Sequence, residues 1–152
     1  MDSCIACELA GGQRHLPGGR IFRTGHWLVE HCVGPLGPGT LIVKPERHVT
    51  SVADLSDDEA LELGPLLRRA SAVAGQLVKA EQVYNCLWSH AGGVSVHIHY
   101  VVQPVTSAQM AEFEGHGPRL QLAMFSRNEA PSESEINRIA ERARQMFAST
   151  GV

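Results

Sequence analysis

Two histidines separated by a single residue, His97 and His99, are the feature of the sequence with the clearest chemical potential. They lie in the apolar segment 96–102, which is expected to form a β-strand. Side chains alternate along a strand, so both imidazoles point to one face, about 7 Å apart, together with Val101. An imidazole can act as an acid, a base, a nucleophile or a metal ligand near neutral pH. The pattern favours a reactive or metal-binding centre, although two hydrogen-bonded histidines at the edge of a core would show the same spacing.

Cys4 and Cys7 form a second candidate centre near the start of the chain. Their two-residue gap allows both thiolates to bind one metal ion, although a redox pair or two surface thiols would have the same spacing. Cys32 and Cys86 are isolated, so the second cysteine pair of a four-cysteine site is missing. Any further protein ligands must therefore be histidines.

The composition is that of a single globular domain spanning residues 1–152, with 43% hydrophobic and 19% charged residues. The net charge is -3 and there is no basic run, which argues against nucleic acid as a partner. No segment approaches the roughly 18–20 apolar residues that cross a bilayer, so no membrane partner is expected. The first residues do not resemble a signal peptide, which predicts a cytoplasmic location with reduced cysteines.

Short strands and two helices are expected to position these residues. Ser56 and Glu59 form a capping box that opens a helix to about Lys79, with a kink at Pro65. A second capping box, at 132–135, opens a C-terminal helix. Strands are expected at 20–24, 27–31, 40–43, 83–88, 96–102 and 120–125, an irregular loop at 105–120, and a metal knuckle and loop at 4–19. The pattern predicts an α+β fold: a five- to six-stranded antiparallel sheet with one long central helix and a C-terminal helix.

Residues 97–104, His-Ile-His-Tyr-Val-Val-Gln-Pro, resemble the motif of the histidine triad superfamily, which is His-x-His-x-His followed by two apolar residues and often a proline. Residues 38–48, Pro-Gly-Thr-Leu-Ile-Val-Lys-Pro-Glu-Arg-His, are similar to the family's Pro-Gly-His-apolar-apolar-Val-x-Pro-Lys-x-His. Residues 52–59 are similar to the segment that leads into the family's long helix. The resemblance covers residues 4 to about 104, a core that leaves 105–152 as a C-terminal extension.

The resemblance implies a nucleotide hydrolase or nucleotidyltransferase. In the family the middle histidine, here His99, attacks the α-phosphorus of a nucleotide or dinucleoside polyphosphate and forms a covalent nucleotidyl-imidazole. Water or a second substrate then removes the nucleotide. The family is usually a homodimer, formed through its sheet and long helix. The positions that the resemblance places at the substrate are Asn85, which matches a family asparagine, Gly92 and Gly93, whose backbone N–H groups suit phosphate oxygens, Thr40 and His90.

Some histidine triad proteins carry an N-terminal Cys-x-x-Cys that binds zinc with two histidines. Carried over to this chain, the ligands are Cys4, Cys7, His48 and the first histidine of the motif, His97. Four protein ligands close a tetrahedral Zn²⁺ site, so the metal would be structural and would stiffen the strand beside His99. The alternative is that His48 is an exposed histidine and the cysteines are free.

The chain also departs from the family pattern. Val101 replaces the third histidine, so position 101 cannot protonate a leaving group, and Thr40 replaces the histidine after Gly39. Cys32 falls near the place of the usual ribose-binding aspartate. The enzyme would then recruit an acid from a loop, such as His90 or His116, or act on a leaving group that needs no proton.

Two other functions stay open at this point. One is a catalytically reduced, zinc-stabilised nucleotide-binding protein. The other is a zinc enzyme in which His97 and His99 both bind a catalytic metal. Lys44 and Arg47 are candidates to steer an anionic ligand, or are ordinary exposed charges. The remaining histidines are expected to be solvated, and the C-terminal helix to pack on the body or on a second subunit.

Overall fold

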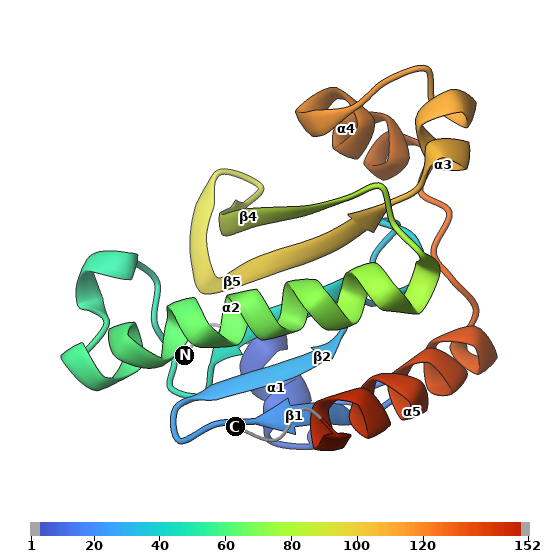
Figure 1. Ribbon diagram of the computed structural model, residues 1–152. Helices are drawn as coiled ribbons and strands as arrows, with labels where there is room; N and C mark the ends of the chain where they lie inside the picture. The colour runs from blue at the N-terminus through green and yellow to red at the C-terminus, as the bar shows by residue number, and fades with distance from the viewer. Residues whose placement is uncertain (1–3, 150–152) are drawn as a thin grey trace.

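A five-stranded antiparallel sheet organises the chain. In the computed structural model, which describes residues 4–149, the strand order is β1-β2-β3-β5-β4 (Figure 1). The strands are β1 (Arg20–Arg23), β2 (Trp27–His31), β3 (Leu41–Pro45), β4 (Gln82–Ala91) and β5 (Val94–Val105). Strand β5, which carries both histidines, is therefore an interior strand between β3 and β4. The predicted α+β class and antiparallel sheet are confirmed.

The long helix α2 (Asp57–Val78) and the C-terminal helix α5 (Glu133–Ser149) cover one face of the sheet (Figure 1). The predicted capping box is present: Ser56 Oγ accepts from Glu59 N–H, and the Glu59 carboxylate accepts from Ser56 N–H. The helix ends at Val78, and the φ of 52° at the next residue, Lys79, is the left-handed geometry of a C-cap. Between these helices and the sheet lies the main core, which includes Trp27, Leu41, Leu66, Val73, Val102, Ile139 and Phe147.

Helix α5 packs on the chain's own body. The rings of Phe22 in β1 and Phe147 in α5 stack at 4.8 Å between centroids, and the Arg69 guanidinium lies 4.5 Å from the Phe22 ring centre. The predicted second capping box is present in part, because the Glu135 N–H donates to Ser132 Oγ over 3.3 Å. The C-terminal helix was expected to pack on the body or on a second subunit, and the structure supports packing on the body.

Three shorter helices lie on the other face: α1 (Ile5–Ala10), α3 (Ser107–Glu112) and α4 (Gly117–Arg127), of which α3 and α4 form a raised helical lobe. The expected strand at 120–125 is wrong, because these residues are helical. Helices also occupy parts of two segments expected to be irregular, α1 in the knuckle and loop at 4–19 and α3 with the start of α4 in the loop at 105–120, while residues 11–19 are a loop as expected. Thr106 and Gln109 form a capping box that starts α3, and Asn128, with a φ of 57°, ends α4. Leu120 and Met124 lie four residues apart, so the helical period brings both onto the sheet.

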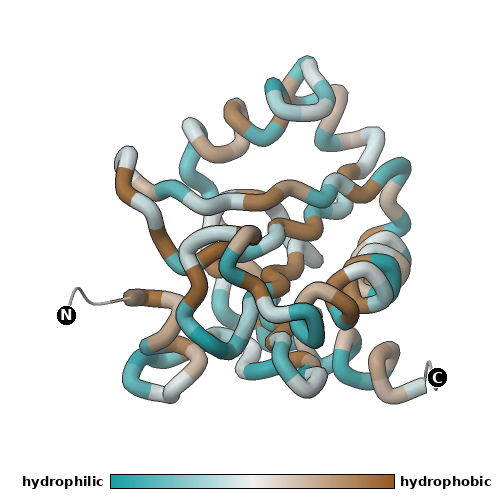
Figure 2. Tube along the Cα trace, turned by 90° about the vertical axis from the view of Figure 1, so that its left-hand side faces the viewer, coloured by the Kyte–Doolittle hydropathy of each residue, from teal (hydrophilic) through white to brown (hydrophobic). Residues whose placement is uncertain are grey.

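The helical lobe encloses a second, smaller core against the sheet. Its buried members are Cys32, Leu36, Val101, Val105, Leu120 and Met124, with Trp88, Tyr84 and Phe113 packed at its edge. Figure 2 shows hydrophobic positions recurring along the strands that cross the middle of the molecule. Within residues 4–149, no helix is long and apolar enough to cross a bilayer.

Candidate functional site

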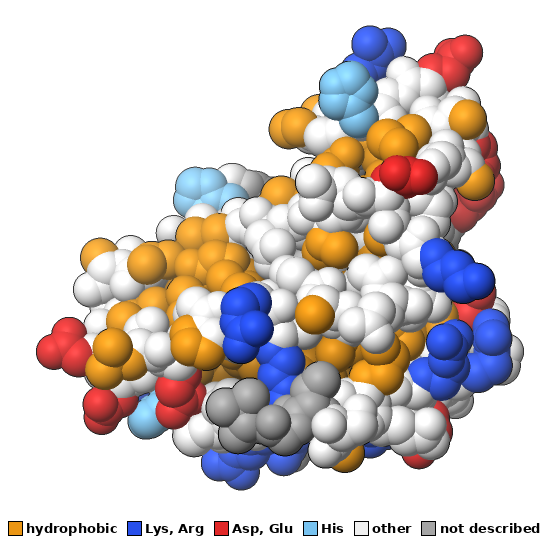
Figure 3. Space-filling view, in the orientation of Figure 1, with side chains coloured by type: hydrophobic (Ala, Val, Ile, Leu, Met, Phe, Trp, Pro, Cys, Tyr) orange, Lys and Arg blue, Asp and Glu red, His pale blue; other side chains and the backbone are white. Residues whose placement is uncertain are grey.

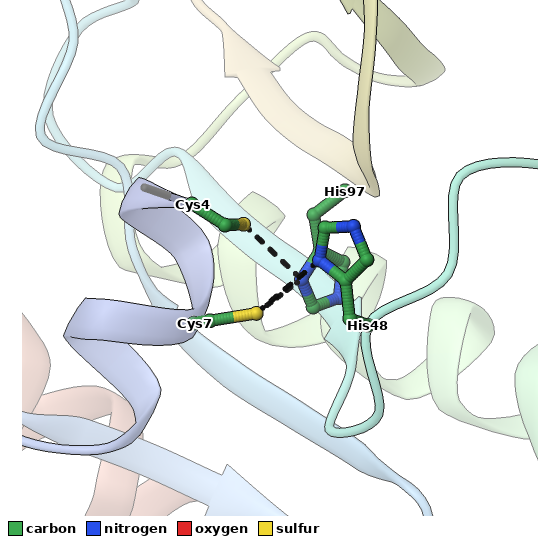
Figure 4. A group of neighbouring side chains, drawn as sticks. All are labelled: Cys4, Cys7, His48 and His97. Atoms are coloured by element: carbon green, nitrogen blue, oxygen red, sulfur yellow. Dashed lines mark hydrogen bonds between the residues drawn. The ribbon is translucent and has the colours of Figure 1, made fainter. Parts of the chain in front are cut away.

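Four side chains from three distant segments meet beside the start of β5 (Figure 4). Cys4 and Cys7 come from the N-terminal end of α1, His48 follows β3, and His97 lies on β5. Their ligand atoms all lie within 4.8 Å of one another. The Cys7 Sγ lies 3.3 Å from His48 Nδ1 and 3.4 Å from His97 Nδ1, and the Cys4 Sγ lies 3.8 Å from His97 Nδ1.

The three Sγ–Nδ1 distances fit one tetrahedral zinc ion. Zn–S bonds of about 2.3 Å and Zn–N bonds of about 2.0–2.1 Å place neighbouring ligand atoms roughly 3.3–3.8 Å apart. Burial, together with the neighbouring Cys4 thiol, raises the pKa of Cys7 to about 11. The thiol therefore stays protonated at neutral pH unless a bound cation stabilises the thiolate. The group is therefore one that could hold a metal ion.

His97 is fixed in the tautomer that a metal ligand needs. Its Nε2–H donates to the Pro45 carbonyl over 2.9 Å, which leaves the Nδ1 lone pair directed at the two cysteines. Burial, followed by the nearby charges of His48 and Lys44, lowers the pKa of His97 to about 4. The ring is therefore neutral, as ligation requires.

His99 is also held in one tautomer, but away from the cysteines. Its Nδ1 lies 3.1 Å from the carbonyl oxygen of His97, and a carbonyl only accepts, so Nδ1 carries the proton. Nε2 is then left with a lone pair. Burial lowers the pKa of His99 below the usual 6.5, so the half-buried ring is neutral at pH 7. A neutral imidazole with a free Nε2 is the form that acts as a nucleophile or base.

An aromatic side chain borders His99 on the same face of the sheet. Trp88 in β4 pairs directly with His99, and the two ring centroids lie 6.3 Å apart. Phe125 in α4 contacts Trp88 edge-on, with 5.6 Å between the ring centroids. Val101, two residues along β5, is 1% exposed and packs beneath α4.

The comparisons with known proteins agree on one fold. No family model matches the chain. A zinc-bound histidine triad family protein from Mycobacterium smegmatis superposes with a TM-score of 0.70 at 18% identity, over 98% of each chain. A hypothetical histidine triad nucleotide-binding protein from Sulfolobus tokodaii superposes with a TM-score of 0.72 at 16% identity, over 95% of this chain and 92% of that one. The chain has the histidine triad fold.

A curated relative supports the same resemblance from sequence. The adenosine 5′-monophosphoramidase hnt1 of Schizosaccharomyces pombe is 25% identical over 107 residues, which are 67% of this chain and 75% of that protein. The resemblance to the histidine triad superfamily read from the His-x-His strand is thereby confirmed. The grouping of Cys4, Cys7, His48 and His97, expected from that resemblance, is also present in the structure.

The third position of the triad motif, Val101, has become part of the packed core. Leu120 and Met124 of α4 share its cluster, together with Cys32 at the end of β2. Burial raises the pKa of the Cys32 thiol to about 11, so it stays a neutral apolar group where a ribose-binding aspartate was expected from the family. Both departures from the triad pattern thus serve packing under the lobe.

Two of the predicted substrate contacts are used elsewhere in this triad fold. Thr40 is fully buried, and its hydroxyl donates to the Leu36 carbonyl over 2.8 Å. Asn85 pairs with Val102 in the sheet and so faces α2, where its amide donates to Ser71 Oγ over 3.0 Å. The structure therefore does not bring either side chain to His99, because one closes a loop and the other lies on the opposite face.

The other predicted contacts lie at the tip of the β4–β5 hairpin. Gly92 and Gly93 form its two-residue turn, with φ values of 58° and 79° that suit glycine. His90 is exposed on β4 just before the turn, beyond a register shift after Trp88. Figure 1 shows this tip curling up from the sheet. Phosphate binding by these three residues stays a prediction.

Charged residues near the site form pairs that sequence reasoning missed. Lys44 was expected to steer an anionic ligand or to be an ordinary exposed charge, yet its side chain is 1% exposed and its Nζ lies 2.7 Å from Glu30 Oε1. The same ammonium donates to the Ala6 carbonyl in α1 over 3.0 Å, which ties the helix that carries Cys7 to the sheet. Strand alternation, applied to β2 and β3 together, would have placed Glu30 and Lys44 on one face.

His31 corrects another expectation, since it is 1% exposed rather than solvated. Its Nδ1 donates to the Cys32 carbonyl and its Nε2 accepts from the Gly39 N–H, over 2.6 and 2.9 Å. Burial lowers the pKa of His31, so the ring is neutral. The His31 ring therefore holds together the two ends of the 32–39 loop.

Proposed function

We propose that this chain is a nucleotide hydrolase or nucleotidyltransferase that uses His99 Nε2 as its nucleophile. The observation that carries the proposal is the hydrogen bond from His99 Nδ1 to the His97 carbonyl, because it fixes the proton on Nδ1 and leaves the Nε2 lone pair for attack. The histidine triad fold and the phosphoramidase relative support a nucleotide as the ligand.

The reaction divides into two displacements at phosphorus. In the first, the Nε2 lone pair forms an N–P bond to the α-phosphorus, and the bond from phosphorus to the leaving group breaks with its electron pair. The imidazole keeps its Nδ1 proton and its bond to the His97 carbonyl, so it carries positive charge in the intermediate. In the second, a water oxygen bonds to phosphorus, the N–P pair returns to Nε2, and the water proton passes to solvent.

A structural role is proposed for zinc at Cys4, Cys7, His48 and His97. Four protein ligands leave no open position, so the ion supplies rigidity and no chemistry. His97 connects the two centres, since its ring belongs to the metal cluster and its carbonyl holds His99. A metal site that also includes His99 is disfavoured, because His99 Nδ1 is bonded to backbone and His99 is outside the cluster.

Trapping of the intermediate tests this function. The protein is mixed with labelled nucleoside phosphoramidates, dinucleoside polyphosphates and nucleotide sugars, quenched within milliseconds to seconds, and analysed for a nucleotidyl adduct. The adduct and turnover are expected in the parent protein and absent in His99→Asn. His15→Asn is the matched control, because His15 is exposed and bonds to Glu133 on α5, away from the site. Absence of both adduct and turnover across the panel would remove the proposal.

The buried Val101 favours one alternative, a zinc-stabilised nucleotide-binding protein with reduced catalysis. This alternative predicts that nucleotides bind and are recovered unchanged. It also predicts that His99→Asn binds them as tightly as the parent protein. Calorimetry with both proteins and chromatography of the recovered ligand separate the two functions.

A homodimer is proposed through β4 and α2, as the resemblance implies. Strand β4 is an outer strand of the sheet, so one side of its backbone is free to pair, and Leu61 on α2 is 74% exposed. Light scattering of the purified protein tests this assembly. A cytoplasmic location stays a prediction.

A further inference from the structure

We infer that the buried pair of Lys44 and Glu30 holds helix α1 in place for metal binding, so that Lys44 is a positioning residue of the metal site. The inference rests on the proposed zinc site, and it gives a role to two residues that are not metal ligands themselves. Its basis is the hydrogen bond from Lys44 Nζ to the Ala6 carbonyl, together with the ion pair between Nζ and Glu30 Oε1.

Lys44 is set apart from the other cationic side chains by its burial. It is the only lysine or arginine that is buried within residues 4–149, and its side chain is 1% exposed. Figure 3 shows the usual placement of charge, with Lys, Arg, Asp and Glu side chains projecting from the face that it draws. Burial takes an ammonium and a carboxylate out of water, and their attraction often stabilises a fold no more than an apolar pair of similar size would. Stability alone is therefore a weak reason for a charged pair at this place.

Strand register puts this pair on the face of the sheet that carries His99. Ile42 of β3 pairs with Val101 of β5, which is two residues from His99. Lys44 is two residues from Ile42, and side chains alternate along a strand, so Lys44 projects from the same face. Glu30 of β2 also pairs with Ile42 and shares this face. Helix α1 lies over the same face, within reach of the Lys44 side chain.

The Lys44 ammonium is fixed between the sheet and α1. Glu30 Oε1 accepts from Nζ over 2.7 Å, and the Ala6 carbonyl accepts from the same Nζ over 3.0 Å. An ammonium has three N–H donors, so it can make both bonds at once. Ala6 lies between Cys4 and Cys7 in the chain. The bond therefore reaches the backbone between the two candidate cysteine ligands.

Helix α1 is too short to be stable by itself. It comprises six residues, and none of them is buried. An isolated helix of this length does not persist in water, because its few hydrogen bonds do not offset the cost of forming the first turn. A bond to its backbone from a buried side chain that is itself fixed by an ion pair is a contact that holds the helix to the sheet.

The position of α1 determines the geometry of the metal site. Figure 4 shows the Cys4 and Cys7 side chains directed from the start of α1 toward the two histidines. The Cys7 Sγ lies 3.4 Å from His97 Nδ1 and 3.3 Å from His48 Nδ1. Metal–ligand distances have to lie within about 0.2 Å of their usual values, so a small shift of the helix would misplace both sulfurs. Holding the helix at Ala6 keeps the ligands preorganised, which raises the affinity for the metal.

Three variants separate the donor at position 44 from the charge pair. Lys44→Met removes the donor and leaves Glu30 unpaired. Glu30→Gln also breaks the charge pair, but its amide oxygen still accepts from Nζ, so the bond to Ala6 is retained. Lys44→Met combined with Glu30→Leu removes the donor and both charges, and the apolar pair that replaces them restores stability. Stability and the donor to Ala6 thus change independently across the set.

Zinc affinity is measured by competition with a chromophoric chelator, and stability by urea unfolding of the metal-free proteins. The two variants that lack the donor are expected to bind zinc about tenfold more weakly than the parent protein, the scale of losing a partner outside the metal ligands. Glu30→Gln is expected to bind zinc nearly as tightly as the parent protein, although it unfolds more easily than the double variant. Zinc affinity should therefore follow the donor at position 44 and not the stability.

Arg14→Ala is the matched control next to α1. The Arg14 guanidinium pairs with Glu8 of α1 over 3.1 Å, but the Arg14 side chain is exposed. An exposed ion pair of this kind contributes little to the position of a helix. Zinc affinity in Arg14→Ala is expected to equal that of the parent protein.

The contrary results fall into two kinds. Recovery of parent zinc affinity in the double variant, or equal losses of affinity in Lys44→Met and Glu30→Gln, would overturn the positioning role, because affinity would then follow stability. If the double variant does not fold, the comparison of the two single variants decides. Absence of zinc binding by the parent protein would remove the metal site and this inference with it, while attack by His99 is tested separately by the nucleotidyl adduct.

Discussion

The carbonyl oxygen of His97 accepts a hydrogen bond from His99 Nδ1 over 3.1 Å, while the His97 ring itself belongs to the metal cluster. One residue therefore connects the candidate metal to the candidate nucleophile. Movement of the His97 backbone would change the orientation of the His99 ring and the position of its Nε2.

Loss of a metal ligand is expected to lower both metal content and stability. Cys7→Ser should reduce bound zinc from one ion per chain to near zero and lower Tm by roughly 10 °C, equivalent to about 3 kcal/mol for a chain of this size. Cys86→Ser, which changes a half-buried cysteine outside the cluster, should retain the metal. Elemental analysis and thermal melts give the answer; full metal content in Cys7→Ser would contradict the ligand assignment.

Removing one charge of the buried pair of Lys44 and Glu30 is expected to lower the free energy of unfolding more than removing both charges. Lys44→Met leaves the Glu30 carboxylate buried without its cation, which should lower the free energy of unfolding by about 3–5 kcal/mol. The double variant with Glu30→Leu should recover most of that loss. Urea unfolding of the single and double variants measures the coupling, and strictly additive losses would show that the two charges act independently.

The free energy of unfolding should fall in acid because the Glu59 carboxylate becomes protonated. Hydrogen bonds from Arg47 and from Ser56 N–H lower the pKa of this carboxyl from 4.5 to about 2. A depressed folded-state pKa contributes stability that is fully present above pH 4.5 and is lost as the pH falls toward 2. The stability difference between the parent protein and Glu59→Gln should therefore be constant from pH 5 to 7 and shrink below pH 4.5. Denaturant unfolding across this range measures it, and a difference that does not change with pH would contradict the assignment.

The stability of the lobe core should depend on Leu120 of α4 and not on Leu122 of the same helix. Leu120→Ala removes a fully buried side chain and is expected to cost about 2–5 kcal/mol. Leu122→Ala, at a position that is 70% exposed, should change stability by less than about 0.5 kcal/mol. Similar losses in both variants would indicate that α4 packs on a different face.

Local sequence patterns were sufficient for the part of the fold that positions the site. The capping box at Ser56 and Glu59 predicted the start of α2, and alternation along β5 placed His97, His99 and Val101 on one face. The meeting of Cys4, Cys7, His48 and His97 came from the family resemblance, because spacing alone cannot bring together segments about 40 and 90 residues apart.

The wrong predictions arose where the order of residues fits both a strand and a helix, or where a partner lies on another strand, so that tertiary contacts decide. In 120–125, Leu120, Leu122 and Met124 alternate as in a strand, while Leu120 and Met124 also fit one face of a helix. Burial against Val101 selects the helix, and that contact cannot be read from the segment itself. Lys44 was misjudged for the same reason, since its partner Glu30 lies on another strand. The role of Val101 as a core residue became evident only once α4 was placed.

The most direct test of the account is the identity of the nitrogen that carries the nucleotide. The trapped protein is digested to locate the modified residue, and phosphorus NMR of the denatured adduct distinguishes attachment at Nε2 from attachment at Nδ1. The hydrogen bond between His99 and the His97 carbonyl predicts a single adduct, on His99 and at Nε2. An adduct at His99 Nδ1, or on any other residue, would contradict it.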